Sequence, residues 1–227
     1  MRVLFLGNSH TYVNDMPHTF AVMCGRLTGE VPEVSMIAYS GRSLAWHLGD
    51  PLSLHFALRY GRYDYCVIQQ QAHPFPDEAA TEKDEETLIS LCRQFGTTPV
   101  VYMTWAEKAR PENAAVMSRF YRKLAQKHGI PLCPVGDLFE QIRDTHPEIG
   151  LYADDGAHAS PTGDYLIAAA FASLLTGTRD LSPLSDRCVD FRLPDKDVPR
   201  DADGMNLTLP AETARILRET AESLWTI

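Results

Sequence analysis

The sequence predicts an α/β domain built on a parallel sheet of five strands that is covered by helices. Five short apolar runs recur along the chain, and segments whose apolar residues recur at helical spacing lie between them. Alternation of strand and helix is typical of a parallel sheet in which right-handed crossovers connect the strands. Polar or glycine-containing segments follow several of the apolar runs, at the sheet edge where α/β proteins bind ligands.

The expected strands cover residues 2–6, 34–39, 63–68, 99–104 and 130–135. The first of them starts as a short apolar run without the alternation of polar and apolar residues that marks a half-exposed strand. Such runs are typical of strands buried on both faces of a parallel sheet.

The expected helices show apolar residues at three- and four-residue spacing. For the first helix, Asp15 is the expected N-cap and Gly29 the expected end. The acidic residues at 77–86 suit the positive N-terminal end of the helix that reaches Phe95. The helices cover residues 17–27, 44–58 with an interruption at Pro51, a segment reaching Phe95, 111–128, 137–145, 161–175 and 210–224.

The chain length of 227 residues fits one sizeable domain. We expect this α/β domain to span residues 1–178. Residues 179–227 are rich in Asp, Pro and Arg up to about Met205 and end in one amphipathic helix. They are expected to form a C-terminal extension packed on the same domain. No internal repeat is present.

Composition excludes several classes of protein. With 44% hydrophobic and 22% charged residues, the chain is that of an ordinary globular protein. A net charge of -9 disfavours binding to nucleic acid or to an anionic membrane. The sequence shows no signal-peptide core and no run as long as a membrane span.

The five cysteines point to a reducing compartment. They are scattered, odd in number and mostly inside apolar runs, so neither a disulfide framework nor a zinc spacing is present. We expect buried free thiols and a cytoplasmic location. The residues are Cys24, Cys66, Cys92, Cys133 and Cys188.

Ser9 is the first candidate for chemistry. The run Leu4–Leu6 breaks at Gly7-Asn8-Ser9, which places a serine where the first strand ends. A serine held there is a candidate nucleophile if a base can reach it. The same residues fit a turn with a helix cap equally well.

Asp155 and His158 supply the base that Ser9 needs. Across a tight turn, the Asp155 carboxylate can accept a hydrogen bond from one ring nitrogen of His158. That bond fixes the tautomer and leaves the other nitrogen able to take a proton from a serine. An Asp-x-x-His spacing alone is more often incidental, so the joint occurrence with Ser9 carries the prediction.

Two further strand ends offer hydrogen-bond donors. Gly41 follows the second strand and leaves its backbone N–H open to a ligand. Gln69, Gln70 and Gln71 follow the third strand, where a side-chain amide can donate to a developing negative charge.

In this order, the motifs resemble those of the SGNH (GDSL-type) hydrolase family along about three quarters of the chain. The resemblance implies a three-layer α/β/α, flavodoxin-like fold and an esterase or acylhydrolase activity. It also implies Ser9 as nucleophile, His158 as base, Asp155 as its orienting partner, and the backbone N–H groups of Ser9 and Gly41 in the oxyanion hole.

Two positions depart from the family pattern. Asn8 stands where the family usually has an aspartate, a residue that is not the nucleophile. The third block, usually Gly-x-Asn-Asp, is absent, and some acetylesterase-like relatives have a glutamine there. Gln69 is the first choice for the amide donor because it directly follows the apolar run. Gln71, which strand alternation places on the same side, is the second.

Three aromatic or imidazole side chains are expected to line a substrate pocket: His10, His73 and Trp105. Each also has a plain structural explanation, as a surface histidine or a core aromatic. No metal site is predicted, because Asp154, Asp155, His158 and His10 have no ligand spacing. No cofactor is expected.

The sequence therefore predicts a serine hydrolase that cleaves a small ester, with an acetylated carbohydrate favoured by the resemblance. An O-acyltransferase that uses the same acyl-enzyme is one alternative. A module on the same fold that binds a glycan or acyl ligand without turnover is another. A nucleotide-binding protein is the least favoured, because no phosphate-binding glycine motif is present. The sequence predicts no particular oligomeric state.

Overall fold

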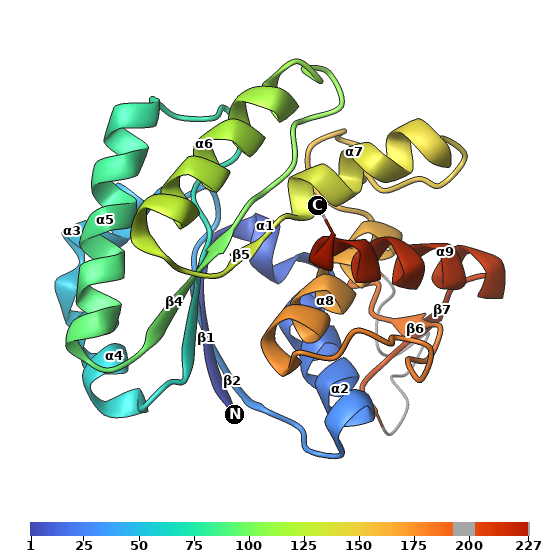
Figure 1. Cartoon of the computed structure of the whole chain (residues 1–227), viewed down its shortest axis with the longest axis horizontal. Coiled ribbons are helices and arrows are strands. Elements are labelled where there is room, and N and C mark those ends of the chain that lie inside the picture. The colour runs from blue at the N-terminus through green and yellow to red at the C-terminus, as the bar shows by residue number, and fades with distance from the viewer. Residues whose placement is uncertain (193–202, 227) are drawn as a thin grey trace. The chain divides into compact units, whose positions relative to one another are not determined.

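The computed structural model describes residues 1–192 and 203–226 (Figure 1). The chain forms two compact units. The sheet unit comprises Met1–Thr11 and Glu33–Gly136, and the helical unit comprises Tyr12–Pro32 and Asp137–Ile227. Both draw on two separate stretches of sequence.

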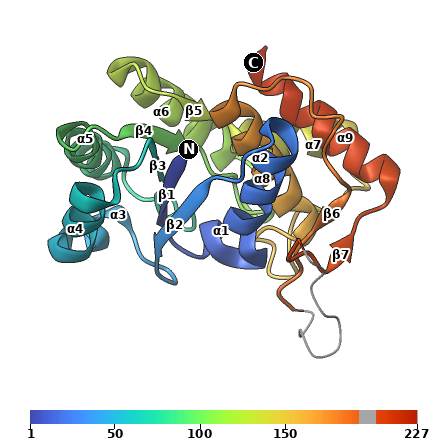
Figure 2. The ribbon, with the colours of Figure 1, turned by 90° about the horizontal axis from the view of Figure 1, so that it is seen from below.

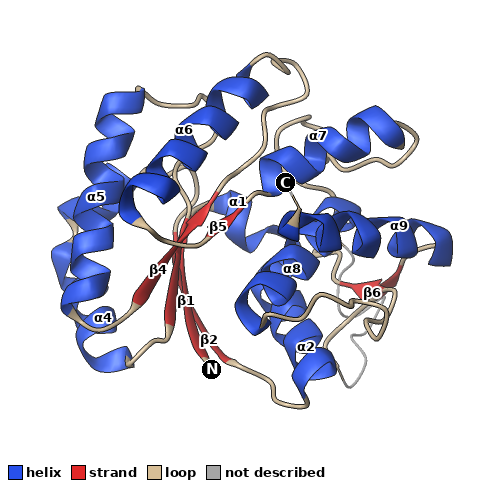
Figure 3. Ribbon diagram, in the orientation of Figure 1, coloured by secondary structure: helices blue, strands red, loops and turns tan. Residues whose placement is uncertain are grey.

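The sheet unit contains a parallel sheet of five strands in the order β2-β1-β3-β4-β5. Strands are drawn in red in Figure 3. Strand β1 pairs with β2 on one side and with β3 on the other, so that Val3 lies opposite both Val34 and Tyr65. The five predicted strands are confirmed. Their bounds are β1 Arg2–Gly7, β2 Glu33–Ala38, β3 Tyr65–Ile68, β4 Thr98–Tyr102 and β5 Leu132–Cys133.

Four helices of this unit connect the strands. One hydrophobic cluster joins Leu4 and Leu6 of β1 to Leu44, Leu58 and Leu88 of the helices that follow β2 and β3. A second cluster packs α6 on β4. The helices are α3 Leu44–Gly49, α4 Pro51–Gly61, α5 Glu78–Gln94 and α6 Asn113–His128. The predicted interruption at Pro51 is the boundary between α3 and α4.

In the helical unit, α8 packs against both α2 and α9 (Figure 2). Almost every residue of α8 is buried, as its largely apolar composition predicts. A two-stranded antiparallel ribbon, β6–β7, lies in the extension. The elements are η1 Val13–Asp15, α2 Met16–Thr28, α7 Val135–Thr145, α8 Pro161–Thr176, β6 Arg187–Cys188, β7 Leu207–Thr208, α9 Ala211–Glu222 and η2 Ser223–Trp225.

Residues after Thr178 are tied to α8. The Arg218 guanidinium of α9 donates to the Tyr165 hydroxyl at 3.0 Å and to Asp186 at 2.6 Å. The Trp225 indole N–H donates to the Ser173 hydroxyl at 2.9 Å. The C-terminal helix predicted at 210–224 thus forms where expected, whereas the domain boundary at 178 stays a prediction.

All five thiols are free and buried. Burial raises the pKa of the Cys24 and Cys188 thiols to about 12, which makes them inert at neutral pH. Within the described ranges, no helix is both long and apolar enough to cross a bilayer.

Glu85 in α5 is a buried acid whose two carboxyl oxygens have no hydrogen-bond partner among the described residues. Burial, reinforced by Cys92 and Asp84, raises the pKa of this carboxyl well above its ordinary 4.5. The folded chain therefore keeps a proton that the unfolded chain loses, and stability falls as pH rises above about 4.5.

Glu85→Gln is expected to remove this pH dependence and to raise the free energy of unfolding at pH 7 and above. The wild-type slope contributed by one such group is up to about 1.4 kcal/mol per pH unit. Urea unfolding at pH 5 and pH 8 measures the change in unfolding free energy with pH, and Glu112→Gln, at an exposed position, is the control. Parallel pH profiles for wild type and Glu85→Gln would contradict the prediction.

Candidate active site

The turn after β1 is held by Asn8. Its side-chain Nδ2 donates to the Arg42 carbonyl at 3.0 Å, and its Oδ1 accepts from the His10 backbone N–H at 3.0 Å. Ser9 follows as the first residue of the short helix α1 Ser9–Tyr12 and is half-buried. An aspartate at position 8 could not donate to the Arg42 carbonyl, which accounts for the asparagine.

Gln69 is locked beneath this turn. Its Oε1 accepts from the Asn8 backbone N–H at 2.8 Å and from the Thr11 hydroxyl at 3.0 Å, and its Nε2 donates to the Gln70 carbonyl. The orientation of the amide follows from the backbone N–H, which can only donate. A Cβ on Gly7 would collide with the Gln69 side chain, so Gly7 is required by this close approach.

The other two glutamines have different roles. Gln70 Oε1 accepts from the Leu44 backbone N–H at 3.0 Å, at the start of α3, and from the Gln71 N–H at 2.8 Å. The Gln71 side chain is half-buried, and its Nε2 makes one long contact of 3.4 Å with the His73 carbonyl. Of the three amides, that of Gln71 is the least committed to the fold.

Gly41 lies in an exposed turn after β2 with φ of +66°. A Cβ added there would meet no atom within 4 Å. The glycine is therefore required by its backbone conformation and not by packing. The turn is closed by the Arg42 N–H, which donates to the Tyr39 carbonyl at 3.1 Å.

The three predicted pocket residues come together in the sheet unit. The ring centroids of His10 and His73 are 4.9 Å apart, and those of His10 and Trp105 are 5.2 Å apart. Trp105 is fully buried and His10 nearly so, and the Tyr102 hydroxyl donates to the His10 carbonyl at 3.3 Å. Contact of this cluster with a substrate stays a prediction.

His47 was not predicted to be near the site. It is buried in α3, and its Nε2 lies 2.8 Å from the Gly7 carbonyl, to which it must donate. Burial lowers the pKa of this histidine, so it is neutral at pH 7. Its helical spacing from Leu44 marks it as inward-facing, but nothing in the sequence shows that it reaches β1.

Asp155 and His158 form the hydrogen-bonded pair that their spacing predicts. The His158 Nδ1 lies 2.6 Å from Asp155 Oδ2, while Asp155 Oδ1 accepts from the backbone N–H groups of Ala157 and His158 at 2.9 Å each. Gly156, with φ of +68°, allows the tight turn. With Nδ1 donating, Nε2 is the acceptor nitrogen of the ring.

Burial raises the pKa of the Asp155 carboxyl, but the hydrogen bonds from His158 and the two backbone N–H groups outweigh it and hold the pKa at about 2. The carboxylate therefore stays ionised at any pH where the protein would work. An ionised partner that accepts from Nδ1–H holds the ring in the tautomer whose Nε2 can accept a proton.

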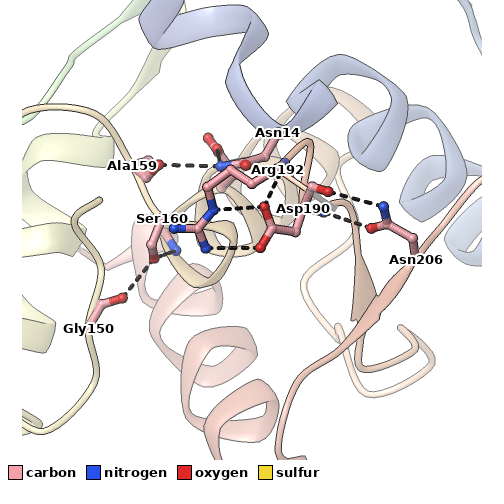
Figure 4. Close-up of polar contacts among 9 residues, drawn as sticks. Asn14, Gly150, Ala159, Ser160, Asp190, Arg192 and Asn206 are labelled. Carbon is pink, nitrogen blue, oxygen red and sulfur yellow. Dashed lines mark hydrogen bonds and ion pairs between the residues drawn. The ribbon is translucent and has the colours of Figure 1, made fainter. Parts of the chain in front are cut away.

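Asn14 supports the His158 turn from another part of the helical unit. Its Nδ2 donates to the Ala159 carbonyl, next to His158, at 3.3 Å (Figure 4). The same Nδ2 donates to Asp164 Oδ2 at 2.6 Å. Asp164 is buried, and burial raises the pKa of its carboxyl well above the usual value. The sequence offers no motif that pairs residues 150 positions apart.

The helical unit has a cavity of about 320 Å³ beside this turn. Asp155 and His158 contribute to its wall, together with Asn14 and with Phe191 and Arg192 of the extension. Ser9, Gly41 and the glutamines belong to the sheet unit, whereas Asp155 and His158 belong to the helical unit.

No protein-family model matches the sequence, and the search of curated proteins found no relative. Solved structures do match. A protein assigned to the SGNH hydrolases from Slackia heliotrinireducens is 29% identical, with a TM-score of 0.64 over 77% of this chain and 98% of that chain.

Two more distant structures share the fold. The lipase/acylhydrolase from Enterococcus faecalis is 16% identical, with a TM-score of 0.63 over 78% of this chain and 96% of its own. A variant of an acetyl-xylooligosaccharide esterase from Geobacillus is 14% identical, with a TM-score of 0.59 over 75% of this chain and 91% of its own. The predicted α/β fold is thereby confirmed.

Proposed function

Because the chain belongs by its fold to the SGNH (GDSL-type) hydrolases, we propose that it hydrolyses small esters through Ser9, His158 and Asp155. The observation that carries the proposal is the Asp155–His158 pair, whose geometry leaves Nε2 as a proton acceptor. A serine hydroxyl needs such an oriented base, because its alkoxide forms only transiently.

In the proposed mechanism, His158 Nε2 removes the proton of Ser9 Oγ as the oxygen attacks the acyl carbon. His158 then gives this proton to the leaving alcohol, and an acyl-enzyme remains on Ser9. Water attacks the acyl carbon with the same base, which releases the acid and restores the serine. The mechanism requires Ser9 Oγ to come within about 3 Å of His158 Nε2.

We assign the oxyanion hole to the backbone N–H groups of Ser9 and Gly41 with the side-chain amide of Gln71. Gln69 is the weaker candidate, because its oxygen and nitrogen are both engaged within the fold. Gln71 carries the same amide, whose one contact among the described residues is long. Donors of this kind stabilise the charge that develops in the transition state.

Gln71→Ala is expected to lower kcat by about a hundredfold while leaving the free energy of unfolding unchanged. Gln69→Ala, in contrast, leaves the buried Asn8 N–H without its acceptor and is expected to cost about 1–3 kcal/mol of stability. Kinetics with p-nitrophenyl acetate and urea unfolding measure the two effects. A stable Gln69→Ala with lost turnover, beside a fully active Gln71→Ala, would reverse the assignment.

A fluorophosphonate probe tests the function itself. An activated nucleophile at Ser9 would be labelled covalently, and mass spectrometry of the digested protein would locate the label. Absence of labelling would favour a non-catalytic binding module. Addition of an acceptor alcohol, with detection of the transferred acyl group, separates a hydrolase from an O-acyltransferase.

We propose an acetyl ester of a carbohydrate as the substrate class. The similarity to an acetyl-xylooligosaccharide esterase supports this choice. A panel of acetyl, butyryl and octanoyl esters tests the acyl length. The five free, buried thiols support a reducing, cytoplasmic location.

A further inference from the structure

The chemistry of the proposed function decides which half of the ester lies beside His158. The general acid protonates the leaving alcohol, so the alcohol oxygen must approach His158. The cavity of the helical unit has His158 in its wall and is therefore suited to the alcohol half. This inference rests on the proposed function.

Asn14 lines the cavity and carries a buried hydrogen-bond acceptor. Its side chain is 2% exposed, and its Nδ2 is committed to Asp164 and Ala159. Its Oδ1 is buried and has no hydrogen-bond partner among the described residues. The backbone at Asn14 is in the left-handed region, with φ of 52°. Strain of this kind and an unpaired polar atom both concentrate at functional sites.

Arg192 gives the cavity a fixed donor. Its Nε and Nη2 donate to the two oxygens of Asp190 at 2.9 Å each (Figure 4). Asn206 holds the Asp190 backbone from both sides, since Asn206 Oδ1 accepts from the Asp190 N–H at 2.8 Å and Nδ2 donates to its carbonyl at 3.0 Å. The guanidinium is thus oriented, yet its side chain remains 52% exposed.

Phe191, next to it, gives the cavity an apolar surface. Its side chain is 58% exposed although it lines the cavity. An exposed aromatic that lines a pocket is typical of a ligand groove. Its flat apolar face suits the C–H face of a sugar ring, while Asn14 and Arg192 suit the hydroxyls at the ring edge.

The charge of the wall argues against an anionic ligand. Asp154 and Asp155 both line the cavity, and Asp190 already neutralises Arg192. The local balance is therefore negative, and a carboxylate or phosphate on the alcohol would be repelled. Hydroxyl groups both donate and accept, so they suit the mixed set of acceptors and donors.

We propose that this cavity is the alcohol subsite of the enzyme and binds a neutral sugar, with Asn14, Phe191 and Arg192 as its contacts. The extension after residue 178 then determines substrate specificity. Phe191 and Arg192 are the diagnostic residues, because Asn14 also anchors the turn that carries His158.

The test compares kcat/KM for a mono-O-acetylated methyl pyranoside with kcat/KM for ethyl acetate, whose alcohol is too small to fill the cavity. Phe191→Ala and Arg192→Gln are each expected to lower this ratio at least tenfold, mainly through KM for the sugar ester. Matched controls are Phe56→Ala, an exposed aromatic at 67%, and Arg215→Gln, an arginine on α9 paired with two glutamates. Neither control should change the ratio.

An unchanged ratio in both diagnostic variants would overturn the subsite. Preference of the wild type for an acetylated uronoside over the neutral pyranoside would overturn the choice of a neutral ligand. If the protein fails to hydrolyse any ester, the proposed function fails separately. In that case binding of the deacetylated methyl pyranoside, followed by NMR titration, still tests the subsite: loss of binding in the two variants supports it, and no binding by the wild type rejects it.

Discussion

Ser9→Ala is expected to lower kcat for ester hydrolysis about a millionfold, to the level of a protein without a nucleophile. No other group on the turn after β1 could replace the hydroxyl, since His10 is nearly buried and its ring lies against those of His73 and Trp105. Hydrolysis of p-nitrophenyl acetate measures the loss, and circular dichroism checks that the fold is retained.

A serine on α4 provides the control. Ser53→Ala removes an exposed hydroxyl that donates to Asp50 Oδ2 at 3.1 Å, so it should leave turnover unchanged. If both variants kept the wild-type rate, the acyl-enzyme mechanism would be wrong.

Asp155→Asn is expected to lower kcat about ten-thousandfold with little change in structure. The asparagine Oδ1 can keep both backbone N–H donors of the turn, which places its Nδ2 opposite His158 Nδ1. Because Nδ2 can only donate, Nδ1 must become the acceptor and the ring proton moves to Nε2. His158 would then hold the wrong tautomer for removing a proton from serine.

The pH profile adds a check on Asp155. Its folded pKa of about 2 lies below the ordinary 3.8, so its stabilising hydrogen bonds are present above about pH 3.8 and are lost as pH falls through about 2. Any loss of activity between pH 4 and pH 7 must therefore come from another group. Asp144→Asn on α7, an exposed carboxylate outside the site, serves as the control. Wild-type turnover in Asp155→Asn would contradict the orienting role.

The local sequence pattern was sufficient to predict the strands and the Asp155–His158 pair. β1 is a run of buried apolar residues ended by Gly7, which hydrophobicity alone indicates. The pair forms within one four-residue turn, so its geometry depends on short-range backbone conformation and not on the rest of the fold. A sequence motif predicts geometry best when the interacting residues are neighbours in the chain, as they are here.

The glutamines show where the pattern was insufficient. Placing Gln69 and Gln71 on the same side assumed that the strand continues, but β3 ends at Ile68. Beyond that point, side-chain direction depends on long-range contacts such as those of Gln69 with Asn8 and Thr11. Asn14 was missed for the same reason, since its partners Ala159 and Asp164 are remote in sequence. Strands of two residues, such as β6 and β7, carry no periodicity to read.

The close approach of Gly7 to Gln69 has a consequence for how such chains can evolve. Any side chain at position 7 would displace the Gln69 amide, which in turn would release the Asn8 N–H. As long as Gln69 is kept, position 7 must therefore remain glycine. Because a Cβ at position 7 would also lie 2.7 Å from Thr11 Oγ1 and 2.9 Å from Gln69 Cβ, a smaller residue at position 69 would not by itself make room for it. Glycine should therefore persist at position 7 among descendants of this sequence.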